Sequence, residues 1–364
     1  MSTLYHRVCC FVLFVVAASA SFSGFYQKSH FCEAGVAGSY DEASFESMVD
    51  GTAYRPYVYR QLLPAIANRI DRIAPDRFKN WLYIHQGSGS SSYMRAMSVS
   101  PTAQNKAYFT RYLIVYLATF LFALLAVYAM YLVCTALEVP RTASVFTPVV
   151  VILLVPYPMS LSGFFYDYSE LAFFALAVWV ALRFDWWWLI PISILGAWNK
   201  ESFLLFIPSL YPILRQRGSR REALVGVGVL CCLCAVIYYC LRVRFAHNPG
   251  ATVEIGLFGQ VRQFLHPRAL LFGTEETYGV RVPRAFSVLP LALLLWTVWR
   301  GWKRLPLVMR RHGQIAAAIN IPMFLLFGHP GELRALSMLY IVFLMLLAVN
   351  LSDWMRGAEA QRAR

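Results

Sequence analysis

Charged residues are scarce in this sequence. Asp, Glu, Lys and Arg make up only 14% of the 364 residues, whereas hydrophobic residues make up 59%, and the mean hydropathy is +0.52. A soluble domain rarely exceeds about half apolar residues, so this composition argues against a soluble protein. The apolar runs are also too long for the strands of a membrane barrel. The sequence therefore predicts an all-α fold, a polytopic bundle of transmembrane helices.

Cysteine is almost absent from the polar segments. Of the eight cysteines, only Cys32 falls in a polar loop, which excludes a disulfide framework. The cluster from Cys231 to Cys234 has metal-like spacing, but no His or carboxylate is near it, so we interpret these cysteines as small core or lipid-facing residues. The sequence also lacks a glycine-rich phosphate loop, a GxSxG motif and an HExxH motif. None of these patterns therefore assigns a residue as a metal ligand.

The net charge of +14 does not require a nucleic-acid partner. Lys and Arg gather between the hydrophobic segments, as the positive-inside rule expects of cytoplasmic loops. If both termini are cytoplasmic, the short inner loops and the termini hold fifteen of these residues, whereas the short outer turns hold only Lys200 and Arg334. The long outer loops are also basic, but long loops cross the membrane largely regardless of charge. The sequence predicts nine or ten spans in the lipid bilayer, with cytoplasmic N- and C-termini. The long loops at 25–108 and 242–284 then lie outside.

The whole chain, 1–364, is predicted to form a single membrane domain. Its parts are a first span at 8–24, an outer loop at 25–108, a helix bundle at 109–351 and a cytoplasmic tail at 352–364. A cleaved signal peptide is the alternative for the first span, because a basic start and Ala18-Ser19-Ala20 fit both. The further candidate spans are 112–135, 144–163, 169–184, 186–198, 203–214, 222–241, 285–302, 314–328 and 335–351.

Two of these segments, 186–198 and 203–214, are too short for full crossings, which need about 20 residues. They predict a bent hairpin with residues 199–202 at its tip. In the outer loop, Leu62, Ile66 and Ile70 recur at helical spacing and predict an interfacial helix. The following GSGSSS run, residues 87–92, reads as a flexible linker.

The predicted topology gathers the unusual polar residues at the outer ends of several helices. Ionisable groups at such depths are costly unless they are paired or hydrated, so a bundle that collects them would enclose an outward-facing cavity. The alternative is that each group sits alone in the headgroup region. The residues are Asp41, Glu42, Asp50, Arg55, Arg60, Tyr166, Asp167, Tyr168, Glu170, Asn199, Lys200, Glu201, His266, Glu275, Glu276, His329, Glu332 and Arg334.

Individual residues have both a functional and a structural interpretation. Asp41 or Asp50 could be a general base or a metal ligand, or could be a solvated loop carboxylate. Arg60 could hold a phosphate bidentately, or could reach toward anionic headgroups. Tyr166 could stack on a sugar ring, although an aromatic-belt role is the more common one.

The remaining acids are predicted to be paired. Glu201 lies in an apolar hairpin, where an ion pair with Lys200 or an arginine is the structural alternative. Glu332 and Arg334 are two residues apart and cannot pair across a regular helix face. We therefore expect each of them to have a partner elsewhere.

Several short patches resemble the GT-C superfamily of integral-membrane glycosyltransferases. These are Tyr40-Asp41, Arg60-Gln61-Leu62-Leu63-Pro64, YDYSEL at 166–171, NKES at 199–202 and GELR at 331–334. The resemblance implies a helix bundle whose long first outer loop carries the catalytic carboxylate and an interfacial helix. Asp41 matches the Tyr-Asp element best and is the first choice for the catalytic carboxylate, and Asp50 is the second choice. The sequence has no clean Asp-x-Asp, and its Arg–Pro element has one extra residue.

The resemblance implies transfer of a sugar from a polyprenyl-phosphate donor to a glycan or lipid acceptor, at the outer face of a bacterial inner membrane. Asp41 would be the base, Arg60 and Arg334 would hold the phosphate, and the other polar groups would bind substrate. Those groups are Arg55, Tyr166, Asp167, Glu170, Lys200, Glu201 and Glu332. The cofactor stays open, with a divalent cation as one option. A polysaccharide polymerase or ligase and a transporter or flippase of lipid-linked glycans are the alternatives.

Overall fold

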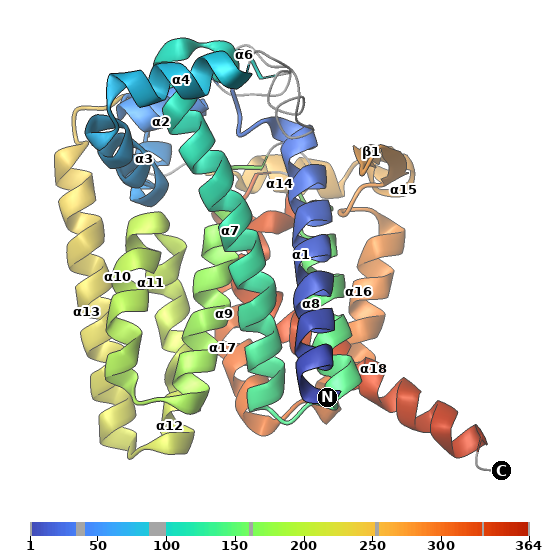
Figure 1. Cartoon of the computed structure of the whole chain (residues 1–364). Coiled ribbons are helices and arrows are strands. Elements are labelled where there is room, and N and C mark those ends of the chain that lie inside the picture. Colours follow the sequence, from blue (N-terminus) through green and yellow to red (C-terminus); the bar gives the residue numbers. More distant parts are fainter. Residues whose placement is uncertain are drawn as a thin grey trace.

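The computed structural model describes residues 2–33, 41–86, 100–159, 163–251, 255–329 and 331–362. Tyr40 and the linker at 87–92 lie outside the described residues, and nothing is described of the Asp41 side chain. Within these ranges the chain is mostly helical (Figure 1), which confirms the all-α prediction. The only strands among the described residues are β1 (Thr274–Thr277) and β2 (Val280–Pro283).

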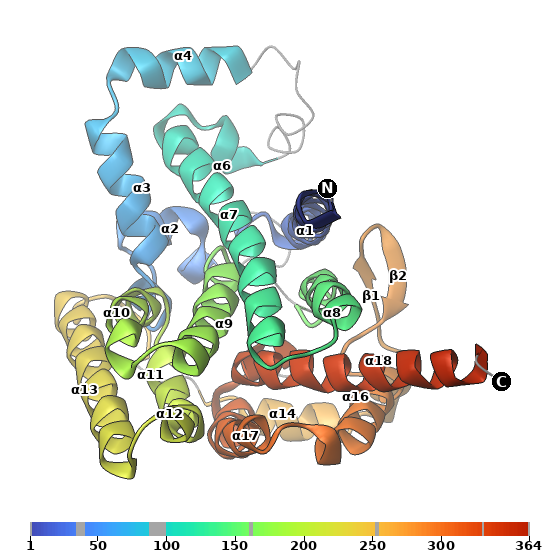
Figure 2. The ribbon, with the colours of Figure 1, turned by 60° about the horizontal axis from the view of Figure 1, so that its bottom comes forward.

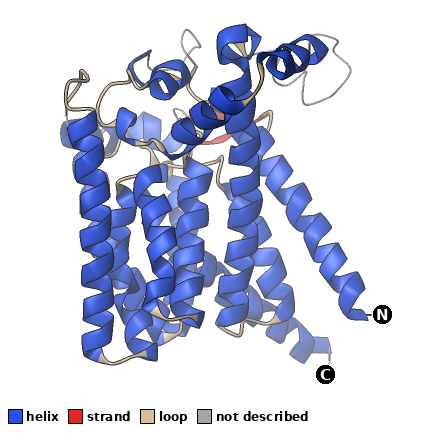
Figure 3. Cartoon of the chain, turned by 60° about the vertical axis from the view of Figure 1, so that its left-hand side comes forward, coloured by secondary structure: helices blue, strands red, loops and turns tan. Residues whose placement is uncertain are grey.

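The longer helices form a bundle, seen from the side in Figure 3. Every apolar segment expected from the sequence overlaps helical structure, but the segment expected at 144–163 is helical only as far as Leu154 in the described residues. The elements concerned are α1 (Ser2–Ser29), α7 (Lys106–Ala136), α8 (Arg141–Leu154), α9 (Asp167–Arg183), η3 (Trp186–Trp188), α10 (Leu189–Asn199), α11 (Ser202–Phe206), η4 (Ile207–Leu210), α12 (Tyr211–Arg217), α13 (Arg220–Arg244), α16 (Val288–Gly301), η5 (Trp302–Arg304), α17 (Leu307–Phe327), η6 (Leu333–Leu339) and α18 (Tyr340–Arg362).

Four helical segments in the described ranges are long and apolar enough to cross a membrane. They are Leu4–Lys28, Lys106–Ala136, Arg220–Arg244 and Leu333–Arg356. The other helices of the bundle are shorter, interrupted or more polar; α8, for example, has 14 residues. The apolar helices therefore indicate association with a lipid bilayer.

Short helices lie across one end of the bundle, opposite to the end where both termini lie (Figure 1). They are η1 (Asp41–Ala43), α2 (Phe45–Asp50), η2 (Tyr57–Tyr59), α3 (Leu62–Ile73), α4 (Asp76–Gln86), α6 (Pro101–Gln104), α14 (Leu257–Phe264) and α15 (Pro267–Phe272). In α3, Leu62 and Leu63 are buried while Ile66, Ile70 and Ile73 are exposed. An exposed apolar face beside arginines is typical of a helix in a membrane interface.

The hairpin of β1 and β2 was not expected from the sequence. Its strands are antiparallel, with Thr277 opposite Val280, and Tyr278 and Gly279 in the turn have φ of 58° and 72°. Two consecutive positive φ values are what a two-residue hairpin turn requires, and glycine adopts them at little cost. The Tyr278 hydroxyl donates to the carbonyl of Leu153 at 2.7 Å and so fixes the hairpin to α8.

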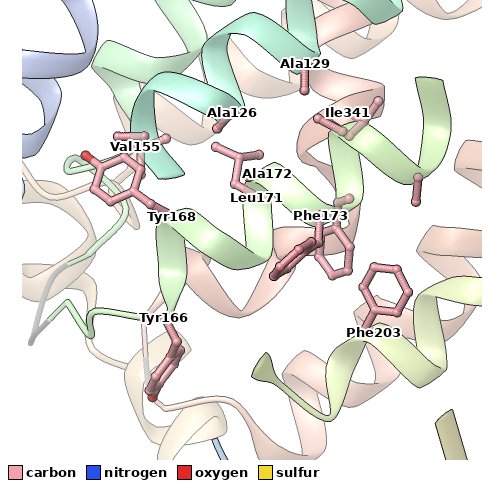
Figure 4. Packing of buried hydrophobic residues seen from close by; sticks show 14 of the residues in the cluster. Ala126, Ala129, Val155, Tyr166, Tyr168, Leu171, Ala172, Phe173, Phe203 and Ile341 are labelled. Atoms are coloured by element: carbon pink, nitrogen blue, oxygen red, sulfur yellow. The ribbon is translucent and has the colours of Figure 1, made fainter. Parts of the chain in front are cut away.

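Helix α9 is the centre of the core. Figure 2 shows α7 and α9 between the group of α10, α12 and α13 and the group of α16, α17 and α18. Small residues of α7, Ala126 and Ala129, are fully buried and lie beside α9 in Figure 4, because small side chains let two backbones approach closely. The first turn of α9 is thereby held at a fixed place inside the bundle.

Candidate functional site

Seven ionisable side chains meet at the end of the bundle that carries the short helices. They come from four parts of the chain, namely the end of η2, the first turn of α9, the turn between α10 and α11, and η6. The residues are Arg60, Asp167, Glu170, Lys200, Glu201, Glu332 and Arg334. We call them the ionic cluster. It holds three cations and four carboxylates, and each member was among the predicted site residues.

Backbone contacts bring these parts of the chain together. The amide of Gln61 donates to the carbonyl of Trp198 at 3.2 Å, which places the end of η2 against α10. Asn199 Nδ2 donates to the carbonyl of Tyr166 at 3.2 Å, and its Oδ1 accepts from Ser169 at 2.6 Å. The end of α10 is therefore tied to the start of α9. Lys200 is extended, with φ −161° and ψ 141°, so the predicted bent hairpin turns there.

Arg60 and Glu201 form the first ion pair of the cluster. Nη2 of Arg60 donates to Oε1 of Glu201 at 2.8 Å and Nε donates to Oε2 at 3.4 Å, while Nη1 donates to the hydroxyl of Tyr166. Burial disfavours the charged form of Arg60, but the charge and hydrogen bond of Glu201 together with Tyr166 and Tyr57 outweigh it and raise the pKa of the guanidinium above its ordinary value. Burial opposes ionisation of Glu201 too, yet the charge of Arg60 lowers the pKa of that carboxyl.

Glu170 is fully engaged by neighbouring donors. Its Oε2 accepts from Lys200 Nζ at 2.7 Å, and its Oε1 accepts from Ser202 at 2.5 Å and from Ser337 at 2.9 Å. The residue is 3% exposed, so these donors compensate for the hydrogen bonds with water that the carboxylate loses on burial. Glu170 therefore joins α9, α11 and η6 at one point.

Asp167 makes a second such junction. Its Oδ2 accepts from the amide of Phe164 at 2.8 Å and from Arg334 Nη1 at 2.9 Å, and its Oδ1 lies 3.9 Å from Lys200 Nζ. Asp167 and Glu170 both occupy the first turn of α9, where the positive end of the helix dipole favours negative charge.

Glu332 and Arg334 pair directly, which contradicts the expectation that their spacing keeps them apart. Arg334 Nη2 lies 3.0 Å from Glu332 Oε1. The expectation assumed an α-helix, but Glu332 precedes the 3₁₀ helix η6 and has φ −95° and ψ 93°. This extended conformation brings the two side chains to the same side. Arg334 thus links Glu332 to Asp167.

A cavity of about 590 Å³ opens beside the ionic cluster. Its lining includes Arg60, Lys200 and Arg334 with Glu170, Glu201 and Glu332, together with Asn320 and the aromatic rings of Tyr57, Phe164 and Tyr238. Phe164 stacks on Tyr166 at 5.0 Å between ring centroids with an interplanar angle of 8°, and Figure 4 shows Tyr166 at the start of α9. The Arg60 guanidinium lies 4.6 Å from the Tyr166 ring. The polar cavity therefore has aromatic as well as charged walls.

An apolar groove of about 870 Å³ lies between α8, α16, α17 and α18. Helix η6 stands between this groove and the polar cavity. Leu333, Leu336 and Leu339 line the groove, whereas Arg334 and Ser337 line the cavity. The 3₁₀ helix repeats every three residues, so one face of η6 is apolar and an adjacent face is polar. The two spaces are thus separated by a single helix.

Two of the predicted site residues, Asp50 and Arg55, do not join the cluster. Asp50 accepts from the hydroxyl of Tyr108 at 2.5 Å and from Arg111 Nη1 at 2.7 Å, which attaches α2 to α7. Arg55 Nη2 donates to the carbonyl of Gly250 at 2.7 Å and so holds the chain after α13. Asp41 begins η1, and its carboxylate is outside what the structure describes. The roles given to these three residues remain predictions.

Sequence reasoning missed Asn320 and Ser337, and it included Ser202 only as the last residue of the NKES patch at 199–202. Asn320 is a polar residue inside an apolar segment, and intramembrane polar residues are commonly functional, so that signal was present. The serines carried no comparable signal, because serine is common at helix ends. No three His, Cys, Asp or Glu side chains in the described ranges are grouped as metal ligands. A divalent cation stays one option, because the carboxyl of Asp41 is not among the described side chains.

The chain was compared with known protein families, with curated proteins and with solved structures. None of these three comparisons gave a match.

Proposed function

We propose that the chain is an integral-membrane glycosyltransferase that moves a sugar from a polyprenyl-phosphate donor to a glycan or lipid acceptor. The observation that carries this proposal is the pair of spaces on either side of η6. A charged and aromatic cavity suits a sugar phosphate, and the adjoining apolar groove suits a hydrocarbon chain. A substrate with a polar head and a hydrocarbon chain needs a polar cavity and an apolar groove side by side, as they are here on either side of η6.

The orientation is part of the proposal. The cavity faces the outside of the cell inner membrane, and both termini are cytoplasmic. Two observations support this. Figure 1 shows both termini at the end of the bundle opposite to the short helices, and the short loops and termini at that end hold fifteen Lys and Arg residues, whereas the short turns at the other end hold two. The nine or ten apolar segments that form helices would be spans or partial spans.

The roles follow from position. Arg60 and Arg334 line the cavity and would hold the donor phosphate and stabilise charge on the leaving group. Asp167, Glu170, Lys200 and Glu201 would set the positions of those two arginines. A carboxylate takes a proton from the acceptor hydroxyl as that oxygen attacks the anomeric carbon, and Asp41 is the proposed base.

A polysaccharide polymerase or ligase is the second candidate. Such an enzyme would rely on arginines more than on a carboxylate, and two arginines line the cavity whereas Asp50 does not. The two candidates differ in one result. The transferase requires a carboxylate outside the cluster, whereas the polymerase retains activity when Asp41 and Asp50 are both replaced by asparagine.

The test is a deletion strain of the source organism, complemented with wild-type or variant chain. Surface glycan and glycolipid are scored by mass spectrometry at matched protein levels. The proposal expects one sugar to be lost on deletion and not restored by Arg60→Ala. An unchanged glycan profile in the deletion strain overturns it, and uptake of a labelled lipid-linked glycan without a new glycosidic bond points to a transporter.

A further inference from the structure

Two side chains on the cavity wall each keep one oxygen without a hydrogen bond in the described part of the chain. They are Asn320, through Oδ1, and Glu332, through Oε1. Asn320 is 3% exposed and Glu332 is 5% exposed. A buried polar oxygen without a hydrogen bond is uncommon in a folded protein, and such a group calls for an explanation. A ligand in the cavity is the explanation that the position of both residues favours.

The orientation of the Asn320 amide is determined by its neighbour. Nδ2 donates to the carbonyl of Ala335 at 2.8 Å, and only the nitrogen of the amide can donate. Oδ1 is therefore the unbonded atom. The amide of Ala335 in turn donates to the carbonyl of Glu332 at 3.3 Å. Asn320 and Glu332 are thus held by the same turn at the start of η6.

The other charged groups around the cavity have partners. Both oxygens of Glu170 accept hydrogen bonds, and both oxygens of Glu201 accept from Arg60. Glu332 Oε1 lies 3.0 Å from Arg334 Nη2, but without the alignment of a hydrogen bond. The hydrogen-bonding atoms left unused on this side of the cavity are therefore acceptors. A bare phosphate also offers only acceptors, so it cannot bond to them.

We propose that Asn320 and Glu332 form a subsite that accepts hydrogen bonds from hydroxyl groups of the sugar. The proposal rests on the proposed function and deepens it, because it assigns residues of the cavity wall to the sugar. The two arginines take the phosphate, and Asn320 and Glu332 take the sugar ring. A site built to hydrogen-bond a hydroxyl rejects an analogue that lacks it, because its buried polar groups are then left unpaired.

The experiment measures lipid binding to the purified full-length chain in detergent by native mass spectrometry. The probes are polyprenyl phosphate and the same lipid carrying a hexose, an aminohexose or a pentose. The variants are Asn320→Leu and Glu332→Gln. Asn350→Leu is the matched control, because Asn350 Nδ2 donates to the carbonyl of Thr297 at 3.0 Å and its Oδ1 is also unpaired, but Asn350 does not line the cavity.

The wild-type chain should bind one sugar-bearing lipid about tenfold more tightly than polyprenyl phosphate, a typical effect of one hydrogen-bonded group. Asn320→Leu and Glu332→Gln should remove this preference and leave binding of polyprenyl phosphate within about twofold, and Asn350→Leu should keep it. Gel filtration and thermal unfolding report whether each variant folds, and Glu332→Gln decides the matter if Asn320→Leu does not fold.

The contrary results are distinct. The subsite is overturned if both variants keep the preference, if both lipids weaken equally in them, or if the wild-type chain prefers none of the sugar-bearing lipids. In those cases the binding of polyprenyl phosphate leaves the proposed function standing. A wild-type chain that binds neither kind of lipid overturns the proposed function, and the subsite with it.

Discussion

Arg60 and Glu201 are 141 residues apart in the chain and meet side on, with Nη2 donating to Oε1 at 2.8 Å and Nε donating to Oε2 at 3.4 Å. Arg60 follows η2 in the first long loop, whereas Glu201 is at the tip of the α10–α11 hairpin. The pair therefore attaches the loop to the bundle at the wall of the cavity. It also makes the loop and the hairpin depend on each other.

Removal of either partner should destabilise the fold. Arg60→Met leaves a partly buried carboxylate unpaired, and Glu201→Met leaves a buried guanidinium unpaired. Each change should cost about 1–3 kcal/mol, and the double variant should cost less than the sum of the two. Thermal unfolding in detergent measures all three proteins. Strictly additive losses would show that the two side chains do not interact in solution.

The same pair predicts an acid-dependent loss of stability. Because the pKa of Glu201 is lower in the folded state than its ordinary value, the ion pair stabilises the fold above the ordinary pKa of a glutamate, about 4.3. That contribution disappears as the pH falls through the lowered, folded-state pKa. Thermal unfolding from pH 7 to pH 3 should therefore show a steeper loss for the wild-type chain than for Glu201→Gln. Parallel curves would refute the assignment.

Asp41 and Asp50 should differ in their effect on transfer. Asp50 is bound to Tyr108 and Arg111 away from the cavity, so Asp50→Asn should retain glycan transfer and lower stability by about 1 kcal/mol or less. Asp41→Asn should abolish transfer at a normal protein level. Complementation with glycan mass spectrometry reports both variants. Loss of transfer in Asp50→Asn alone would make Asp50 the base and would require α2 to move.

Gly196 on α10 leaves no room for a larger side chain beside the hairpin tip. A Cβ there would lie 2.4 Å from the ring of Phe203, and that ring packs against Phe174 and Phe206. Gly196→Ala should therefore cost about 1–3 kcal/mol and displace the hairpin tip. Gly228→Ala on α13 is the control, because no atom lies within 4 Å of its Cβ position. The unfolding temperature should fall only for Gly196→Ala, and equal effects would contradict the packing shown.

The apolar groove should be needed for lipid binding. Leu336 lines the groove, so Leu336→Trp should fill part of it and weaken binding of polyprenyl phosphate at least tenfold, roughly 1.4 kcal/mol. Leu224→Trp is the control, since Leu224 is 51% exposed on α13 and outside the groove. Native mass spectrometry with the purified chain measures both. Unchanged binding in Leu336→Trp would show that the lipid chain lies elsewhere.

The residues that form the site could be predicted, but not their partners. Each of the seven members of the ionic cluster stood out in the sequence because charge at the end of an apolar segment is costly unless paired. Which cation meets which carboxylate depends on which helices are neighbours. Glu201 pairs with Arg60 from the first loop, whereas Lys200 beside it pairs with Glu170. No spacing within the sequence encodes these contacts.

The sequence by itself determined the helices, because apolar segments of this length must satisfy their backbone hydrogen bonds internally and bury their side chains. It also determined the turn at 199–202. Only the tertiary structure decided that Asp50 lies apart from the cavity, that Glu332 pairs with Arg334 and that Asn320 faces the cavity. Those outcomes depend on the packing of α9 against its neighbours and on the 3₁₀ geometry of η6. Both are set by contacts between residues far apart in the chain.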